Sequence, residues 1–172
     1  MALYSASVEY GLHCLLNLVG SDGEVNVSSF DLAEFQGVSA SYVAKLLTQL
    51  KAAGLVTASE GAQGGYRLAR AADQITVLDV VEALDGHKPL FQCKEIRRQC
   101  ALFGAAPPSW ATKGPCSIQA VMLEAEDKMK RSLASHTLAE LAARVADKAP
   151  RKFALDVSAW FASRRSGKSR GQ

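Results

Sequence analysis

The sequence has no long apolar segment. No stretch approaches the roughly 20 consecutive apolar residues that a helix needs to cross a bilayer. The first residues, MALYSASVEYGLHC, carry no basic region, and Glu9 and His13 interrupt their apolar pattern, which is not the pattern of a signal peptide. We therefore expect a cytoplasmic protein with no membrane partner.

The sequence also lacks an excess of one charge over most of its length. Residues 1–156 carry 16 Lys and Arg side chains against 17 Asp and Glu side chains, and the net charge of +3 comes from the end of the chain. A broad basic surface for nucleic acid is therefore excluded, and any such contact must be local. The final residues, SRRSGKSRGQ, are typical of a disordered, solubilising tail.

Sequence signatures of an enzyme are missing. The glycine-rich stretch at 60–65 is not followed by the Lys-Ser or Lys-Thr pair of a phosphate-binding loop. The four cysteines include no C-x-x-C pair, and no nucleophile–base pair is visible, which argues against a thiol–disulfide oxidoreductase. We expect neither an enzyme nor a small-molecule substrate. Four cysteines in an intracellular chain then need a metal, redox or core explanation, and Cys14, in an apolar helix, fits the core.

The sequence does contain the pattern of a winged helix. With 172 residues and 48% hydrophobic composition, the chain has room for one domain with an extension. Apolar spacing, serine caps and a tight turn at Gly37 predict two short helices joined as a helix-turn-helix, then two strands around a glycine-rich tip. The expected helices cover residues 5–20, 28–36 and 39–53, and the expected strands cover residues 55–58 and 66–69.

The remainder divides by composition. A helix capped by Thr76 ends at Gly86, and a long stretch with little periodicity separates it from an amphipathic helix over 117–135. Such a helix is the natural dimerisation element of a small DNA-binding protein, so we expect a homodimer. The fold class is mainly α: a winged helix-turn-helix with a two-stranded wing and a long C-terminal dimerisation helix. The expected parts are the DNA-binding domain 1–86, a loop 87–116, dimerisation helices 117–146 and an extension 147–172 with the basic tail.

The second helix of a helix-turn-helix presents its first residues to the major groove of DNA. Residues 39–55 contain two lysines and no acid, which is a local positive charge in a mildly acidic body. A solvated helix face is the alternative interpretation, and the wing that follows makes DNA contact the better one. The predicted DNA contacts are Ser39, Ser41, Tyr42 and Lys45 in the helix and Gln63, Gly64, Gly65 and Tyr66 in the wing.

Several strings, taken in order, resemble the cluster-binding winged-helix regulators, the superfamily of IscR, NsrR and RsrR. The strings are VEYGLHCLLNL at 8–18, VSASYVAKLLTQLKAAGLV at 38–56, GAQGGYRLAR at 61–70, ITVLDVVEALDG at 75–86 and FQCKEIRRQC at 91–100. The resemblance covers roughly residues 1–145. It implies a homodimer in which an iron–sulfur cluster near the loop and the first helix controls DNA binding. Glu60 stands where many relatives carry an arginine, and an acid there repels phosphate.

Three of the four cysteines lie in the loop. IscR-like and NsrR-like regulators use three closely spaced cysteines, whereas Cys93, Cys100 and Cys116 are spread over a longer stretch. The better resemblance is to the RsrR-like branch, which implies a cluster held by Cys93 and Cys116 of one subunit. By the same resemblance, Glu9 and His13 of the other subunit complete the ligands. Their spacing puts them on one helix face, although such a pair is more often a surface hydrogen bond. Cys100 is a third ligand, a thiol that condenses with Cys93, or a spectator.

The sequence thus predicts a transcription regulator that holds a [2Fe–2S] cluster and binds a double-stranded DNA operator with an affinity set by redox or iron–sulfur status. Imidazole in place of thiolate raises the reduction potential of a cluster, which suits reversible cycling. Two alternatives stay open. One is a nitric-oxide- or iron-responsive [4Fe–4S] cluster, and the other is a cluster-free thiol switch or a zinc site with the same ligands.

Overall fold

The computed structural model describes residues 2–19, 26–61, 64–104 and 106–168. The chain forms two compact units, one of residues 1–86 with 133–172 and one of residues 87–132, and each is described by itself. None of the helices in the described ranges combines the length and the apolar character needed to cross a membrane.

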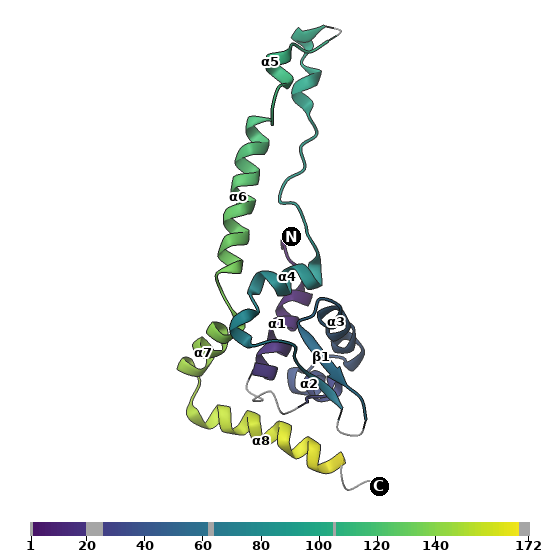
Figure 1. Ribbon diagram of the computed structural model, residues 1–172, viewed down its shortest axis with the longest axis vertical. Helices are drawn as coiled ribbons and strands as arrows, with labels where there is room; N and C mark the ends of the chain where they lie inside the picture. The colour runs from purple at the N-terminus through teal and green to yellow at the C-terminus, as the bar shows by residue number, and fades with distance from the viewer. Residues whose placement is uncertain (1, 20–25, 62–63, 105, 169–172) are drawn as a thin grey trace. The chain divides into compact units, whose positions relative to one another are not determined.

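The first unit is built around α1 (Ala6–Val19), α2 (Ser29–Gln36) and α3 (Ala40–Ala52) (Figure 1). The hydroxyls before α2 and α3, those of Ser28 and Ser39, accept hydrogen bonds from backbone N–H groups of the first turns, which sets where the helices begin. The residue that follows α2 adopts a left-handed conformation, with φ of 67°, and it is the predicted glycine. The predicted helix-turn-helix is confirmed. Its fully buried side chains include Leu15, Leu32, Val43, Leu47 and Leu50.

Strands β1 (Val56–Ser59) and β2 (Gly65–Leu68) pair antiparallel and form the predicted wing. Their register places Ala58 opposite Tyr66. Val27 and Tyr66 exchange backbone hydrogen bonds of 3.0 and 2.8 Å, so a segment before α2 pairs with the outer side of β2. The wing is therefore attached to the helix-turn-helix by backbone as well as by side chains.

Helices α4 (Val77–Asp85) and α7 (Leu138–Lys148) complete the core of this unit. Each begins with a capping box, at Thr76 and at Thr137, in which the cap hydroxyl and an acidic side chain satisfy each other's backbone N–H groups. Backbone hydrogen bonds of 2.8 and 2.9 Å join the two helix starts. Leu138 is fully buried, so α7 packs with the winged helix.

Helix α8 (Arg151–Lys168) occupies most of the C-terminal extension. Where the sequence predicts a disordered basic tail, the structure continues the helix to Lys168, and Arg170 lies outside the described residues. Contacts with the winged helix explain the difference: Phe161 is 9% exposed, and its ring centroid lies 5.0 Å from that of Phe35 in α2. Tertiary packing of this kind stabilises helices that local sequence alone does not specify.

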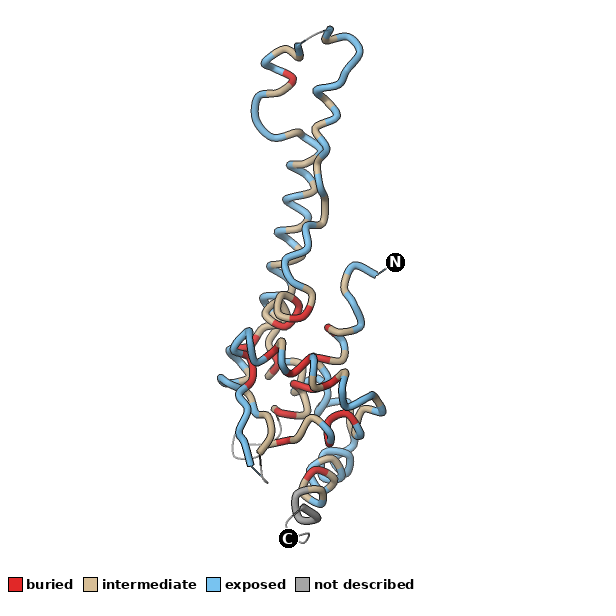
Figure 2. The backbone as a smooth tube through the Cα atoms, turned by 90° about the vertical axis from the view of Figure 1, so that its right-hand side faces the viewer, coloured by how far each residue is buried: buried red, intermediate tan, exposed pale blue. Residues whose placement is uncertain are grey.

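The second unit contains the loop and most of α6 (Ser117–Ala134). Two short 3-10 turns and the one-turn helix α5 (Ser109–Thr112) interrupt otherwise extended chain. Prolines and glycines in this stretch prevent longer helices. Figure 2 shows mainly exposed and intermediate residues here, and Ala111 is the one buried residue among those described in this unit.

Candidate functional site

The start of α3 holds the four residues predicted to contact DNA. Ser39, Ser41 and Lys45 are exposed, and the Ser39 hydroxyl accepts a hydrogen bond from the Tyr42 N–H at 3.3 Å. Among the described residues, no side chain pairs with the Lys45 ammonium group, which leaves it available to a phosphate. The helix therefore presents these residues where the sequence places them, and their contact with DNA stays a prediction.

Tyr42 has a second role that sequence reasoning missed. Its hydroxyl lies 3.1 Å from the Ser7 hydroxyl in α1, and its ring meets the Tyr10 ring edge-on with 5.5 Å between centroids. The phenol is thus half-buried and engaged with α1 instead of projecting freely toward DNA. No spacing in the sequence reveals this contact, because it depends on how α1 crosses α3.

The two wing glycines approach the protein's own backbone. A Cβ atom on Gly65 would lie 2.8 Å from the carbonyl group of Val27, and one on Gly64 would overlap the carbonyl oxygen of Ser59. Internal packing alone therefore requires glycine at both positions, whatever else the wing contacts. Gln63, the remaining predicted residue of the wing tip, lies outside the described residues.

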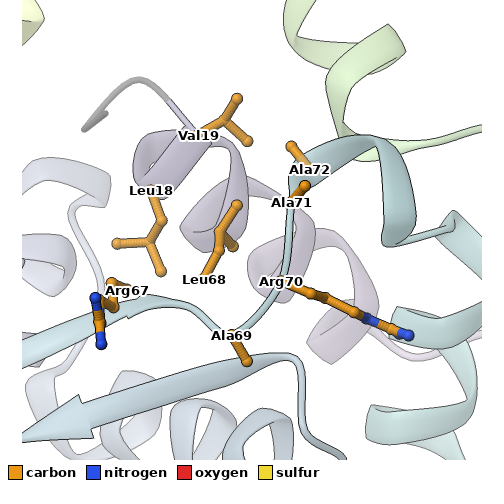
Figure 3. Close-up of a pocket in the computed structure, with 8 residues that line it drawn as sticks. All are labelled: Leu18, Val19, Arg67, Leu68, Ala69, Arg70, Ala71 and Ala72. Carbon is orange, nitrogen blue, oxygen red and sulfur yellow. The ribbon is translucent and has the colours of Figure 1, made fainter. Parts of the chain in front are cut away.

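Arg67, on the exposed side of β2, is a wing residue that sequence reasoning missed. Its guanidinium donates a hydrogen bond of 3.3 Å to the Thr57 hydroxyl, whereas Arg70 is paired with Asp79 at 3.1 Å. Figure 3 shows the two arginines on either side of a pocket of about 270 Å³ between the end of α1 and the chain after β2. Arg67 thus offers a positive charge to a phosphate, and the alternation of the strand is the pattern that would have identified it.

Glu9 and His13 lie on the exposed surface of α1, one turn apart, as their spacing predicts. Cys14 is fully buried, and burial raises the pKa of its thiol to about 11. A hydrogen bond of 3.4 Å from the Gln36 amide to the Cys14 sulfur partly opposes that effect. Cys14 therefore belongs to the core, while the other two side chains remain accessible to a partner.

The structure brings Cys93 and Cys116 together from the two ends of the loop, and neither is in a disulfide. The pKa of the Cys116 thiol is lowered mainly by the backbone N–H groups of Gln119 and Ile118 at the start of α6. The positive charge of Arg97 and the neighbouring Cys93 side chain lower it further. Cys116 thus sits in surroundings that favour the thiolate.

Arg97 and Glu95 hold the two ends of the loop in place. Arg97 donates hydrogen bonds to the Gly114 carbonyl at 2.7 Å and to the Glu95 carboxylate at 3.0 Å, and the bond from Arg97 is the main cause of the lowered pKa of Glu95. The Glu95 N–H donates to the Cys93 sulfur at 3.4 Å. Glu95 has φ of 52°, a left-handed conformation that is unfavourable for a side chain of this size. Sequence reasoning missed both residues, because neither belongs to a ligand pattern.

Cys100 is exposed between the two 3-10 turns. In the described part of the chain, no group of three or more His, Cys, Asp or Glu side chains is arranged to hold a metal ion. The adjacent Cys93 and Cys116 thiols are two of the four protein ligands that a [2Fe–2S] cluster takes. The donor chemistry of this pair therefore fits such a group, provided that the other ligands come from elsewhere.

Comparison with known proteins places the chain in a family. Residues 4–144 match the Rrf2 family, described as an iron-dependent transcriptional regulator. The chain belongs to the Rrf2 family. Protein rrf2 of Nitratidesulfovibrio vulgaris is 37% identical over 132 residues, which are 77% of this chain and 81% of that protein. The solved structure of CymR, the global cysteine regulator of B. subtilis, is 27% identical with a TM-score of 0.66, and the match covers 84% of this chain and 98% of CymR. For T. potens IscR the identity is 26%, the TM-score is 0.63, and the coverage is 87% and 93%.

Rrf2 membership confirms the winged-helix fold and the prediction of a transcriptional regulator. Relatives of this Rrf2-family protein are named as regulators, in keeping with the expected absence of catalysis. The family match ends at residue 144, so α8 lies beyond it. The RsrR-like branch and the ligand set stay predictions.

Proposed function

We propose that this Rrf2-family protein is a homodimer that binds a double-stranded DNA operator with an affinity set by redox or iron–sulfur status. One observation carries the proposal: the thiols of Cys93 and Cys116, from opposite ends of an irregular loop, lie together at the start of α6. Adjacent thiols in surroundings that favour a thiolate are typical of metal and redox sites. The description of the family as iron-dependent supports the metal.

The proposed group is a [2Fe–2S] cluster held by Cys93 and Cys116 of one subunit and by Glu9 and His13 of the other. When bound, it supplies a one-electron change in charge, and imidazole ligation raises its reduction potential. Cys116 holds it as a thiolate, because the N–H groups at the start of α6 stabilise negative charge. Glu9 and His13 are exposed on α1, as ligands donated to a second chain must be.

Helix α1 connects the proposed ligands to the DNA-reading helix. Ser7 bonds the Tyr42 hydroxyl in α3, and Tyr10 packs on the same ring, so the residues on both sides of Glu9 contact α3. A displacement of α1 would therefore move α3, and two such arrangements with different operator affinities make a switch. Lys45 would then meet DNA phosphates at a different spacing between the two subunits.

A cluster-free thiol switch is the second candidate function, and the same pair of thiols favours it. Cys116, as the thiolate, attacks a peroxide, and the resulting sulfenic acid condenses with Cys93 to a disulfide with loss of water. The similarity to CymR, a cysteine regulator, fits this alternative as well as the first. A zinc site or a [4Fe–4S] cluster responsive to iron or nitric oxide would use the same thiols and differ in metal and sulfide content.

Mixed dimers test whether the ligands come from two subunits. Cys93→Ala removes a thiolate and His13→Ala removes the imidazole, so each variant alone should form a folded dimer that takes up no cluster. A heterodimer of the two variants keeps one site with all four ligands. Anaerobic reconstitution with iron and sulfide should therefore restore about half of the wild-type visible absorbance, as expected for one cluster in place of two.

Cys100→Ala is the matched control, and it should keep the full absorbance. A heterodimer that stays colourless would place the ligands within one chain and overturn the proposed site. Stoichiometric zinc without colour would favour the zinc alternative. A reversible Cys93–Cys116 disulfide in metal-free wild-type dimers, with no cluster uptake, would favour the thiol switch.

A further inference from the structure

An apolar groove of about 480 Å³ lies between α1 and α2 on one side and α7 and α8 on the other. The rings of Phe35 and Phe153 line it together with small residues of α7 such as Ala142. No Lys, Arg, Asp or Glu side chain is among its lining residues, and its volume is within the range of small-molecule sites. His13 also lines it, but the proposed cluster accounts for none of the remaining lining.

The wall formed by α8 is held by contacts of its own. The Trp160 ring meets the Phe35 ring with 5.1 Å between centroids, and Arg164 makes two bonds, of 2.7 and 2.6 Å, to the Glu34 carboxylate. The Arg164 guanidinium also covers the Trp160 ring at 4.5 Å. Because α8 lies beyond the residues that match the Rrf2 family, family membership does not account for this wall.

Two amide side chains supply most of the polar atoms of the lining. The side-chain N–H group of Gln36 donates a hydrogen bond of 3.4 Å to the Cys14 sulfur. The side-chain oxygen of Gln36 is buried and has no hydrogen-bond partner among the described residues. Asn17 uses its N–H group on the His13 carbonyl at 3.0 Å. An acceptor without a donor is unfavourable in a protein interior, and the last torsion of a glutamine is soft enough to turn the oxygen toward a ligand.

We propose that this groove binds a neutral aromatic molecule of one or two rings that carries a hydroxyl group. The absence of Lys, Arg, Asp and Glu from the lining selects a neutral ligand, and the rings of Phe35 and Phe153 select an aromatic body. The unpartnered oxygen of Gln36 selects a hydrogen-bond donor. Since Phe35 and Gln36 form the end of α2, the ligand contacts the helix-turn-helix directly. The site requires neither Cys93 nor Cys116.

Titration calorimetry of the full chain with two matched probes tests the proposal. 2-Naphthol has the aromatic body and the hydroxyl donor, whereas 2-methoxynaphthalene has the body without the donor. We expect 2-naphthol to bind about tenfold more tightly, which is the effect of one hydrogen bond. Gln36→Leu should make the two probes bind equally.

Two alanines of α7 give a matched pair of variants. Ala142 lines the groove and Ala143 does not, so Ala142→Phe should abolish binding of 2-naphthol while Ala143→Phe preserves it. Undiminished binding to Ala142→Phe, or equal binding of the two probes to the wild-type chain, would overturn the proposal. If 2-naphthol binding disappears when the protein concentration is raised until dimers form, a second copy of the chain occupies the groove. That result would overturn the proposed small-molecule site.

Discussion

At the scale of single residues, the cysteines differ most in their surroundings. Burial raises the pKa of Cys14 to about 11, whereas the backbone N–H groups at the start of α6 lower the pKa of Cys116. Only the thiolate attacks an alkylating reagent. A raised pKa therefore slows alkylation at a given pH, and a lowered pKa extends it to more acidic pH.

We expect iodoacetamide to modify Cys116 in the reduced, metal-free protein while Cys14 stays unmodified under native conditions. As the pH is lowered from alkaline toward neutral, the alkylation rate of Cys116 should stay high at pH values where the alkylation rate of free glutathione has already fallen. Peptide mass spectrometry over a time course measures both rates. Arg97→Gln should slow the reaction at Cys116, because it removes a positive charge that stabilises the thiolate. Modification of Cys14 as fast as Cys116 would contradict the structure.

Lys45 and Tyr42 should respond differently to substitution. Lys45→Ala should weaken DNA binding and reduce the slope of log affinity against log salt by about one, because one phosphate contact is lost.

Tyr42→Phe removes the hydrogen bond to Ser7 and should lower the free energy of unfolding by about 1 kcal/mol. Fluorescence anisotropy with DNA and urea unfolding measure the two effects.

The double variant Ser7→Ala/Tyr42→Phe separates this bond from general destabilisation. It should be little less stable than Tyr42→Phe alone, because both substitutions remove the same bond. Full additivity of the two effects would show that the hydroxyls do not interact.

The spacing of residues in the sequence was enough to predict that Glu9 and His13 are neighbours, but not that Tyr42 and Ser7 are in contact. The helical period places Glu9 and His13 on one face, because that information lies within a single turn. The bond between Tyr42 and Ser7 depends on the crossing of two helices, and the spacing within either helix does not encode it.

At the scale of helices and strands, helix N-caps were the sequence feature that predicted the structure most reliably. The helix starts after Ser28, Ser39 and Thr76 agree with the sequence, because a cap and its partner lie within three residues of each other. Helix α8 differs from the expectation because its stability comes from Phe35, far away in the chain.

Single substitutions should rank the contacts of α8. Phe161→Ala should lower the free energy of unfolding by about 3 kcal/mol, because the ring is nearly buried against α2. Arg164→Ala should cost at most about 1 kcal/mol, because its ion pair with Glu34 is partly exposed. Arg151→Ala, at the exposed start of α8, is the matched control and should be neutral. Urea unfolding gives all three values, and equal losses for Phe161→Ala and Arg151→Ala would refute the packing of α8.

At the scale of the whole molecule, α6 leaves part of its apolar surface exposed in the described chain. It buries none of its side chains, and Ile118 and Val121 are 63% and 64% exposed. An 18-residue helix with an exposed apolar stripe is expected to pack against a partner, and the proposed homodimer supplies one.

Val121→Glu should convert the dimer into a folded monomer, because it places a charge in the apolar stripe. Asp127→Ala, on the opposite face of α6, should leave the dimer intact. Sedimentation velocity measures the mass of each variant, and circular dichroism reports whether it is folded. A dimer unaffected by Val121→Glu would exclude this face as the interface.

The pair of Cys93 and Cys116 is proposed to hold an iron–sulfur cluster. The iron and sulfide content of protein purified without oxygen tests it most directly. We expect about two irons and two sulfides per chain, with visible absorbance that Cys93→Ala abolishes while the dimer stays folded. A colourless wild-type dimer, or a coloured one whose absorbance survives Cys93→Ala, would contradict it.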